Sequence, residues 1–292
     1  MLSVGAIISG TFGFARRNVP IIAVWCILHM ACGICMSLLL RPLFEAQLAA
    51  MTAPEPGLPD GVFGYLALFY AIFTVMFIVL FAAAFRAVLS PVQARAAYLR
   101  LGMDELRLLG LMLVLFVGLW LAMVAAGIVA MIIALVLALV MGKGAVLLFA
   151  GLACAGLFGG LIYLTVRFSI AAPLTVLRGR LALAEAWNLT KGHFWAMFGA
   201  YICIALIISV PFLIFVVMMA GGFYHHIVEA PYDPAAFSAA MHEQLALQAP
   251  GKPLWFIGVI GGALLGGIAI ALQGAMTAIA ARELLAQRAT GA

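Results

Sequence analysis

The chain has 292 residues, of which 67% are hydrophobic and only 9% charged, with a mean hydropathy of +1.26 and a formal net charge of +5. A soluble domain carries roughly 25% charged residues, so this composition excludes a soluble globular protein and indicates a bilayer as the solvent. The positive charge does not indicate a nucleic-acid-binding protein, because no soluble basic domain exists to carry it.

Six apolar runs are each long enough to cross a bilayer core about 30 Å thick, which needs about 20 helical residues. The runs are continuously apolar and lack the two-residue alternation of barrel strands. We therefore predict an all-α, polytopic membrane protein whose single domain covers 1–292. The runs are 19–40, 62–85, 108–141, 145–166, 196–220 and 254–280.

The third run is too long for one upright crossing, because its 34 residues (108–141) would extend about 51 Å as a helix. It has to be tilted, kinked near Gly118 or Gly127, or extended past the membrane. No polar turn interrupts it. The segment 142–144, Gly-Lys-Gly, is the only good hairpin between the third and fourth runs.

Basic residues gather on one side of the predicted spans. With the N-terminus inside, twelve of the fifteen Lys and Arg residues face inward, and only Arg41, Lys143 and Lys252 face outward. This distribution predicts that both termini are cytoplasmic. The first run is longer than the apolar core of a signal peptide, so we expect a permanent helix. Abundant Arg and Ala indicate a bacterial inner membrane. The inward residues are Arg16, Arg17, Arg86, Arg95, Arg100, Arg107, Arg167, Arg178, Arg180, Lys191, Arg282 and Arg288.

Three amphipathic segments, 1–18, 89–107 and 173–194, each precede an outward-going run. One interpretation is a three-fold repeat of a two-helix module with a lead-in helix on the cytoplasmic side. The other is that any multi-span protein repeats basic and apolar segments. In either case we expect the lead-ins to lie in the interface plane, with Lys and Arg toward headgroups.

Residues 167–195 carry a family resemblance. Arg167 opens a segment containing Pro173, and an aromatic element then enters the fifth run. This pattern resembles the membrane domain associated with bacterial glycerophosphoryl diester phosphodiesterases and the related YciC-like inner-membrane proteins. The resemblance implies a fold and a location rather than an activity. The phosphodiesterase chemistry of that family belongs to a separate barrel of about 250 residues, for which six spans leave no room. The matching positions are Trp187, Leu189, Thr190, Lys191, Gly192, Phe194 and Trp195.

The same segment supplies candidate lipid-headgroup residues. Basic side chains at the interface attract lipid phosphate, and tryptophan fixes the depth of a helix there. The alternative is a membrane-anchoring elbow without a ligand, in which Pro173 ends the fourth helix and Gly192 provides a turn. The candidates are Arg167, Arg178, Arg180, Lys191, Trp187 and Trp195.

The remaining groups of cysteine and histidine residues give little indication of a metal or redox site. Cys26, His29, Cys32 and Cys35 spread over about 180° of a helix, so they do not converge as a metal or redox site would. His29 is an ionisable group inside a span and hence a functional candidate. The alternative is a neutral histidine that is hydrogen-bonded to a neighbouring helix.

The outer loop 221–253 contains weak zinc candidates in His225, His226 and His242. Their spacing matches no known ligand pattern, and a solvated cap over the outer face is the other interpretation. Asp233 reads as the N-cap of a short helix that ends near Gln248.

Glycine spacing predicts close helix packing in the sixth span, where Gly258, Gly262 and Gly266 recur every four residues. We expect tight association with the fourth span, or a homodimer or partner membrane protein bound through this face. The glycines of the fourth span are Gly151, Gly156, Gly159 and Gly160.

The predicted function is a non-catalytic accessory or scaffold protein of the inner membrane that interacts with anionic lipid. The alternative is a small transporter or permease, although Gln273 is the main polar amide in any span. An intramembrane enzyme of lipid metabolism, with His29 as its titratable group, is the third interpretation. No cofactor is expected.

Overall fold

The computed structural model describes residues 2–51, 61–90, 95–229 and 234–290, and every regular element in these ranges is helical. Six of the described helices are long and apolar enough to cross a membrane, which confirms the predicted all-α, six-span architecture. The elements are α1 (Val4–Arg17), α2 (Val19–Met51), α3 (Val62–Leu89), the 3₁₀ helix η2 (Arg95–Tyr98), α4 (Met103–Met141), α5 (Lys143–Phe168), α6 (Ala171–Arg178), α7 (Leu183–Leu189), α8 (Phe194–Glu229), α9 (Pro234–Leu247) and α10 (Pro253–Thr290).

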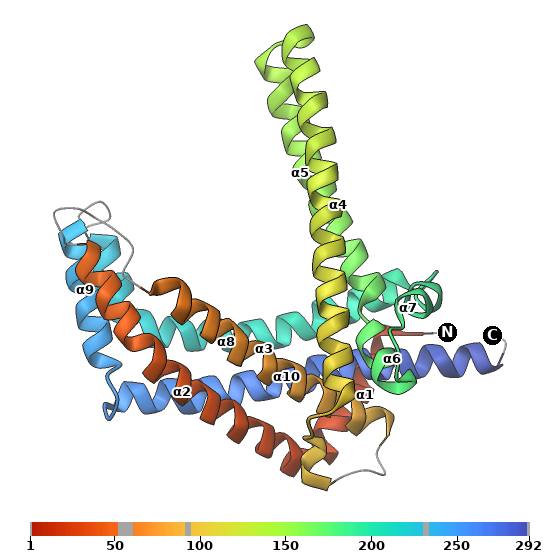
Figure 1. The fold of residues 1–292 in the computed structure, drawn as a ribbon, viewed down its shortest axis with the longest axis horizontal. Helices are drawn as coiled ribbons and strands as arrows, with labels where there is room; N and C mark the ends of the chain where they lie inside the picture. The colour runs from red at the N-terminus through yellow and green to blue at the C-terminus, as the bar shows by residue number, and fades with distance from the viewer. Residues whose placement is uncertain (1, 52–60, 91–94, 230–233, 291–292) are drawn as a thin grey trace.

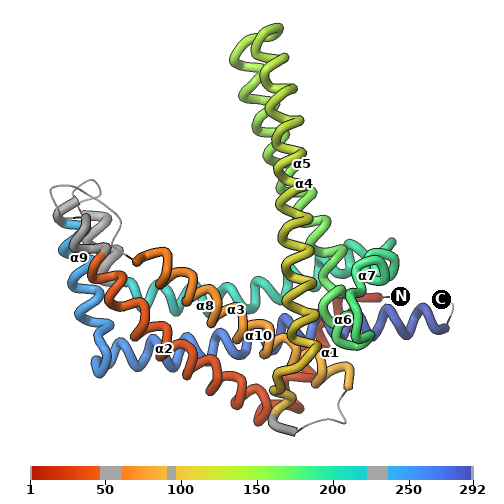
Figure 2. Tube along the Cα trace, in the orientation of Figure 1, coloured from red at the N-terminus to blue at the C-terminus, as the bar shows by residue number. Residues whose placement is uncertain are grey.

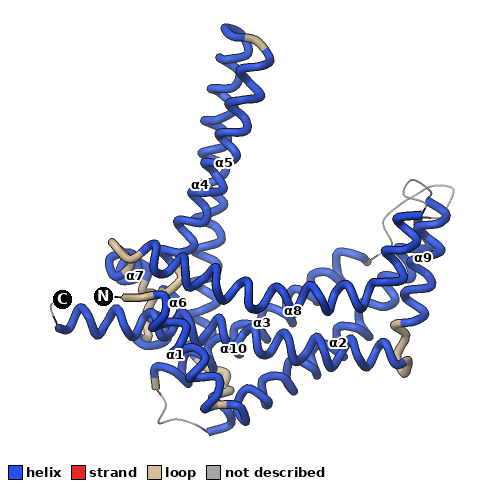
Figure 3. The backbone as a smooth tube through the Cα atoms, turned by 180° about the vertical axis from the view of Figure 1, so that it is seen from behind, coloured by secondary structure: helices blue, strands red, loops and turns tan. Residues whose placement is uncertain are grey.

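Two arms extend from a common hub (Figures 1 and 2). The larger arm contains α2, α3, α8 and α10, with α9 at its far end, and the smaller arm is the α4–α5 hairpin. The hub contains α1, α6 and α7 at the base of the hairpin, and both ends of the described chain lie on this side. The view from behind shows the same separation of the two arms (Figure 3).

The third run forms one uninterrupted helix of 39 residues, α4, so neither Gly118 nor Gly127 divides it. At 1.5 Å per residue it is about 58 Å long, well beyond a bilayer core. Gly142 ends the helix with a φ of 82°, a left-handed conformation that favours glycine, and α5 starts at the next residue. The hairpin predicted at 142–144 is therefore confirmed.

Helix α10 is the central helix of the larger arm and packs against α1, α2, α3 and α8. Small residues allow this close approach. A Cβ atom at Gly267 would lie 2.9 Å from the Cα atom of Cys26 on α2, and one at Gly274 would lie 2.6 Å from the Cβ atom of Ala84 on α3. Close packing of small residues holds helices together where the solvent is itself apolar.

The predicted glycine face needs correction. A Cβ atom at Gly258 would contact the side chain of Met219, and one at Gly266 would overlap the ring of His29, but nothing lies within 4 Å of a Cβ at Gly262. The glycines of α5 also have no neighbour within 4 Å, and α5 packs against α4, α7 and α8. Tight association of the fourth and sixth spans is therefore wrong. Contact between two chains through Gly258, Gly262 and Gly266 stays a prediction.

The three lead-in segments differ from one another. The first forms the helix α1, and the third forms the two short helices α6 and α7. In the described part of the second, the 3₁₀ turn η2 at 95–98 precedes the start of α4 at Met103, and Ala97 and Tyr98 have positive φ values of 53° and 61°. A helix cannot continue through left-handed residues. Their position in the interface plane stays a prediction.

Candidate functional site

The candidate site forms where the ends of α5 and α7 meet at the hub. Helix α5 ends at Phe168, so the predicted break near Pro173 is confirmed, and Pro173 lies in the first turn of α6. The buried hydroxyl of Thr190 donates a hydrogen bond of 3.1 Å to the carbonyl oxygen of Arg167. This bond fixes the end of α7 against the end of α5 and brings Trp187 beside Arg167.

The guanidinium of Arg167 lies over aromatic rings. Its central carbon is 4.2 Å from the centre of the Trp187 ring and 5.8 Å from that of Tyr163. The Trp187 ring is held by Phe168 at 5.4 Å and by Tyr163, edge to face, at 6.2 Å. A cation over an indole face is stabilised by the ring's quadrupole, the more so when water is excluded.

Arg167 is a charged side chain that is only 4% exposed. Its Nε atom is buried without a hydrogen-bond partner. Within the described residues the guanidinium makes no ion pair. Burying a charge without a counter-ion costs several kcal/mol. The arrangement is therefore a desolvated cation whose Nε–H has no hydrogen-bond partner, which suits an anionic ligand.

Arg86, at the end of α3, is a second buried arginine, and it differs from Arg167 in having acidic partners. Arg86 is equally buried, at 3% exposed. Its Nη2 atom lies 2.5 Å from Glu105 and 3.1 Å from Asp104, and its Nη1 atom donates to the carbonyl oxygen of Tyr98 at 3.2 Å. Asp104 is also paired with Arg100, at 2.9 Å. Arg86 is therefore a structural ion-pair centre that joins α3 to α4.

The remaining predicted headgroup residues are not gathered around Arg167. Arg178 is paired with Glu185 at 2.8 Å, and the exposed Arg180 approaches the same carboxylate at 3.9 Å. Lys191 is exposed, and Trp195 is 76% exposed. Among the six candidates, the structure thus places only Arg167 and Trp187 in contact.

Glu185, Glu105 and Asp104 are functional partners that the sequence reasoning missed. Each of these carboxylates forms an ion pair with at least one arginine. Asp104 and Glu105 pair with Arg86, although they lie 18 and 19 residues after it. The signal was the position of acidic residues in the first turns of α4 and α7, close to predicted basic clusters.

The described residues contain no group of three or more His, Cys, Asp or Glu side chains that could hold a metal ion. His242 lies on α9, whereas the side chains of His225 and His226, and Asp233, lie outside the described residues. All five cysteines are free thiols. The His29 ring packs against Gly266 and lines a cavity, and it makes no hydrogen bond with another described residue, so its bonding to a neighbouring helix stays a prediction.

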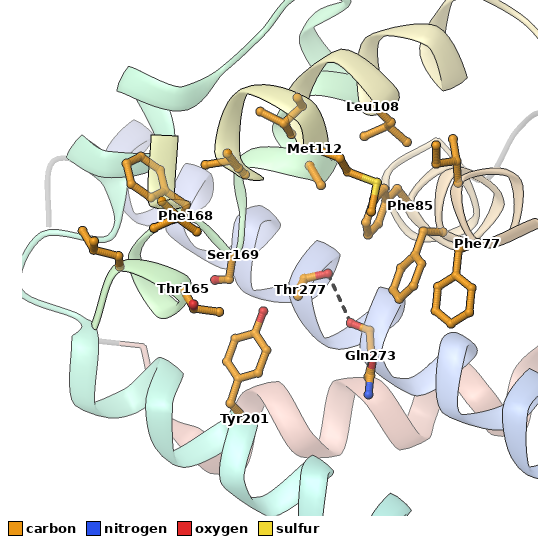
Figure 4. A pocket seen from close by; sticks show the side chains of 17 residues that line it. Phe77, Phe85, Leu108, Met112, Thr165, Phe168, Ser169, Tyr201, Gln273 and Thr277 are labelled. Carbon is orange, nitrogen blue, oxygen red and sulfur yellow. Dashed lines mark hydrogen bonds between the residues drawn. The ribbon is translucent and has the colours of Figure 1, made fainter. Parts of the chain in front are cut away.

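One cavity lies at the hub between the two arms, and another lies within the larger arm. The hub cavity, of about 330 Å³, lies between α3, α4, α5, α8 and α10, where the two arms diverge (Figure 4). The hydroxyl-bearing side chains of Thr165, Ser169, Tyr201 and Thr277 gather at one side of it. The far cavity, of about 670 Å³, lies between α2, α3, α8, α9 and α10 and includes His29.

Comparison of the chain with protein-family models, with curated proteins and with solved structures finds no match. The resemblance of residues 167–195 to the phosphodiesterase-associated and YciC-like membrane families therefore stays a prediction. Six described helices are long and apolar enough to span a membrane, which is compatible with a membrane protein and specifies no function.

Proposed function

We propose that the chain is a multi-pass protein of the bacterial inner membrane, with cytoplasmic termini, that acts without catalysis as an accessory or scaffold protein and binds anionic lipid. The observation that carries the proposal is the guanidinium of Arg167, which is buried over Trp187 and makes no ion pair with the described residues. The lipid phosphate supplies the missing counter-ion.

The chemistry of the pair supports a phosphate ligand. A guanidinium presents five N–H donors in a planar fork that matches two phosphate oxygens, and hydrogen bonds of this charged kind are about twice as strong as neutral ones. Trp187 covers one face of that plane, so the donors at its edge remain for the ligand. Arg167 lies at the end of a span, at the depth where headgroups lie if the predicted topology holds.

The exposed cations of the hub have a secondary role in this proposal. Lys191 and Arg180 are exposed, and each basic residue near an anionic leaflet adds about 1 kcal/mol of attraction. This attraction is not directional and is screened by salt. Selectivity for phosphate therefore rests on Arg167, whereas Lys191 and Arg180 raise the local concentration of anionic lipid.

Native mass spectrometry of purified protein tests the proposal. Arg167→Gln removes the charge but keeps an amide, and we expect the affinity for co-purified phosphatidylglycerol to fall about tenfold or more, the worth of a lost charged hydrogen bond. The double variant Arg180→Gln with Lys191→Gln should lose less. The matched control is Arg288→Gln, an exposed arginine on the same side of the molecule, which should retain lipid normally.

A structural elbow without a ligand predicts another outcome. Lipid retention would then be the same in the wild type and in Arg167→Gln, and the variant would change only thermal stability in detergent. Unchanged retention of phosphatidylglycerol in correctly folded Arg167→Gln would end the phosphate-binding proposal.

A further inference from the structure

A ladder of phenylalanine rings runs along α3 and joins the two cavities. Successive rings lie four residues apart, with centres 5.7, 4.5, 5.8 and 5.9 Å apart. Phe73 and Phe77 line the far cavity, and Phe77, Phe81 and Phe85 line the hub cavity. Phe77 is therefore the one described α3 residue that forms a wall of both.

Phe77 lies near the middle of its span. It follows Val62, the first residue of α3, by 15 positions and precedes Leu89, the last, by 12. These separations correspond to about 22 Å and 18 Å along the helix. Along α3, the far cavity thus lies toward Val62 and the hub cavity toward Leu89, and both include Phe77 near the middle of the helix.

Each cavity contains a polar side chain that lacks a protein partner close to this meeting point. His29 lines the far cavity and Gln273 the hub cavity, and neither side chain makes a hydrogen bond within the described part of the chain. The ring of His29 packs on Gly266, which precedes Gln273 by two turns of α10, about 10.5 Å. Polar groups in hydrocarbon are costly unless something bonds them, so they mark a path for a polar group.

The ends of the two cavities are also polar. At the far end, the indole N–H of Trp255 donates to the hydroxyl of Ser37 at 3.4 Å, and Arg41 lines the same cavity. At the hub end lie the hydroxyl groups of Ser169 and Tyr201 (Figure 4). None of the described residues that line either cavity is Asp or Glu. The lining thus combines hydrogen-bond donors and one arginine, Arg41, which pairs with Glu45 at 2.7 Å, with apolar walls.

These properties fit one occupant, a membrane phospholipid. Its phosphate accepts hydrogen bonds and carries negative charge, which matches a path that has donors and no carboxylate. Its acyl chains match the phenylalanine ladder and can extend into the bilayer where the two arms diverge. Neither cavity has to enclose the whole lipid, since the surrounding solvent is itself hydrocarbon.

We propose that the two cavities are successive stations of one path by which a phospholipid moves passively between leaflets, and that Phe77 is the gate between them. His29 and Gln273 receive the headgroup in turn on either side of this gate. The proposal goes beyond phosphate binding at Arg167 and does not rest on it, because the residues that carry it lie within the larger arm and the hub cavity.

Transbilayer movement of a fluorescent phospholipid tests the path. The full chain is reconstituted into liposomes of phosphatidylcholine and phosphatidylglycerol with a trace of NBD-labelled phospholipid, and dithionite bleaches the outer leaflet. We expect bleaching beyond the outer-leaflet plateau with the wild type. Phe77→Ala should accelerate this second phase several-fold and Phe77→Trp should slow it. Phe69→Ala, which alters a ring of the same ladder that lines neither cavity, should behave as the wild type.

Substitutions of His29 and Gln273 test the path separately from any folding defect that the Phe77 variants cause. His29→Leu and Gln273→Leu leave the gate in place and should each slow the second phase. Equal bleaching in wild-type and protein-free liposomes overturns the proposal, and so do equal rates for Phe77→Ala, Phe77→Trp and the wild type. The outcome does not depend on the proposal for Arg167, because no variant in this assay alters that residue.

Discussion

The guanidinium of Arg167, at the end of α5, lies 4.2 Å from the centre of the Trp187 ring on α7, and the same arginine has no ion pair with the described residues. The two residues are 20 positions apart and meet because Thr190 bonds the carbonyl oxygen of Arg167. The indole provides partial compensation for the desolvated charge and leaves the N–H donors unused. An anionic ligand completes the compensation.

Substitutions of Trp187 and Trp195 should differ in effect. Trp187→Ala removes the ring that covers Arg167, so we expect lower retention of phosphatidylglycerol and a loss of about 1–2 kcal/mol in unfolding free energy. Trp195→Ala removes a ring that is 76% exposed and should leave retention unchanged. Native mass spectrometry and thermal unfolding in detergent measure both. Identical losses of lipid in the two variants would contradict the role of Trp187.

Arg86 should be a stability residue without a lipid phenotype. Arg86→Met leaves the carboxylates of Glu105 and Asp104 without their buried partner, and we expect a destabilisation of about 3–5 kcal/mol. The matched control, Arg100→Gln, removes an ion pair whose arginine side chain is 54% exposed and should cost about 1 kcal/mol or less. Thermal unfolding in detergent is the measurement. If both variants were equally stable, the buried network would not hold α3 to α4.

Close packing on α10 predicts a position-dependent effect of larger residues. Gly267→Val places a side chain against the backbone of Cys26 and should destabilise the fold by more than about 1 kcal/mol. Gly262→Ala should be nearly neutral, because nothing lies within 4 Å of its Cβ position. Accumulation in membranes and thermal stability report both effects. The reverse order would show that α10 is rotated relative to α2.

The six-span topology predicts opposite compartments for the two sides of the larger arm. A reporter fused after Ala292 should be cytoplasmic, and one inserted in α9 (Pro234–Leu247) should be external, because basic residues concentrate at the hub. Compartment-specific reporter activity measures this directly. Equal labelling of both sites by an impermeant reagent would refute the single span, α10, between α9 and the C-terminus.

Hydropathy predicted the six helices and the turn at Gly142, because the length of an apolar run and the conformation of a glycine are local properties. Which glycines are tightly packed was not predictable, since Gly262 and Gly266 share the same sequence spacing and differ only in what α2 and α8 place opposite them. Sequence analysis predicted Arg167 and Trp187 as lipid-headgroup residues together with four other candidates. Only the fold separates Arg167 from Arg178, because the partner of each arginine is set by tertiary contacts.

The most direct measurement of the central claim is an experimental structure of the protein in nanodiscs of phosphatidylglycerol, with a bound antibody fragment to add mass. We predict a lipid phosphate about 3 Å from the guanidinium nitrogens of Arg167, with the Trp187 ring still stacked on the cation. A guanidinium bonded only to protein carboxylate or carbonyl oxygens, with no headgroup beside it, would contradict the proposed lipid-binding function.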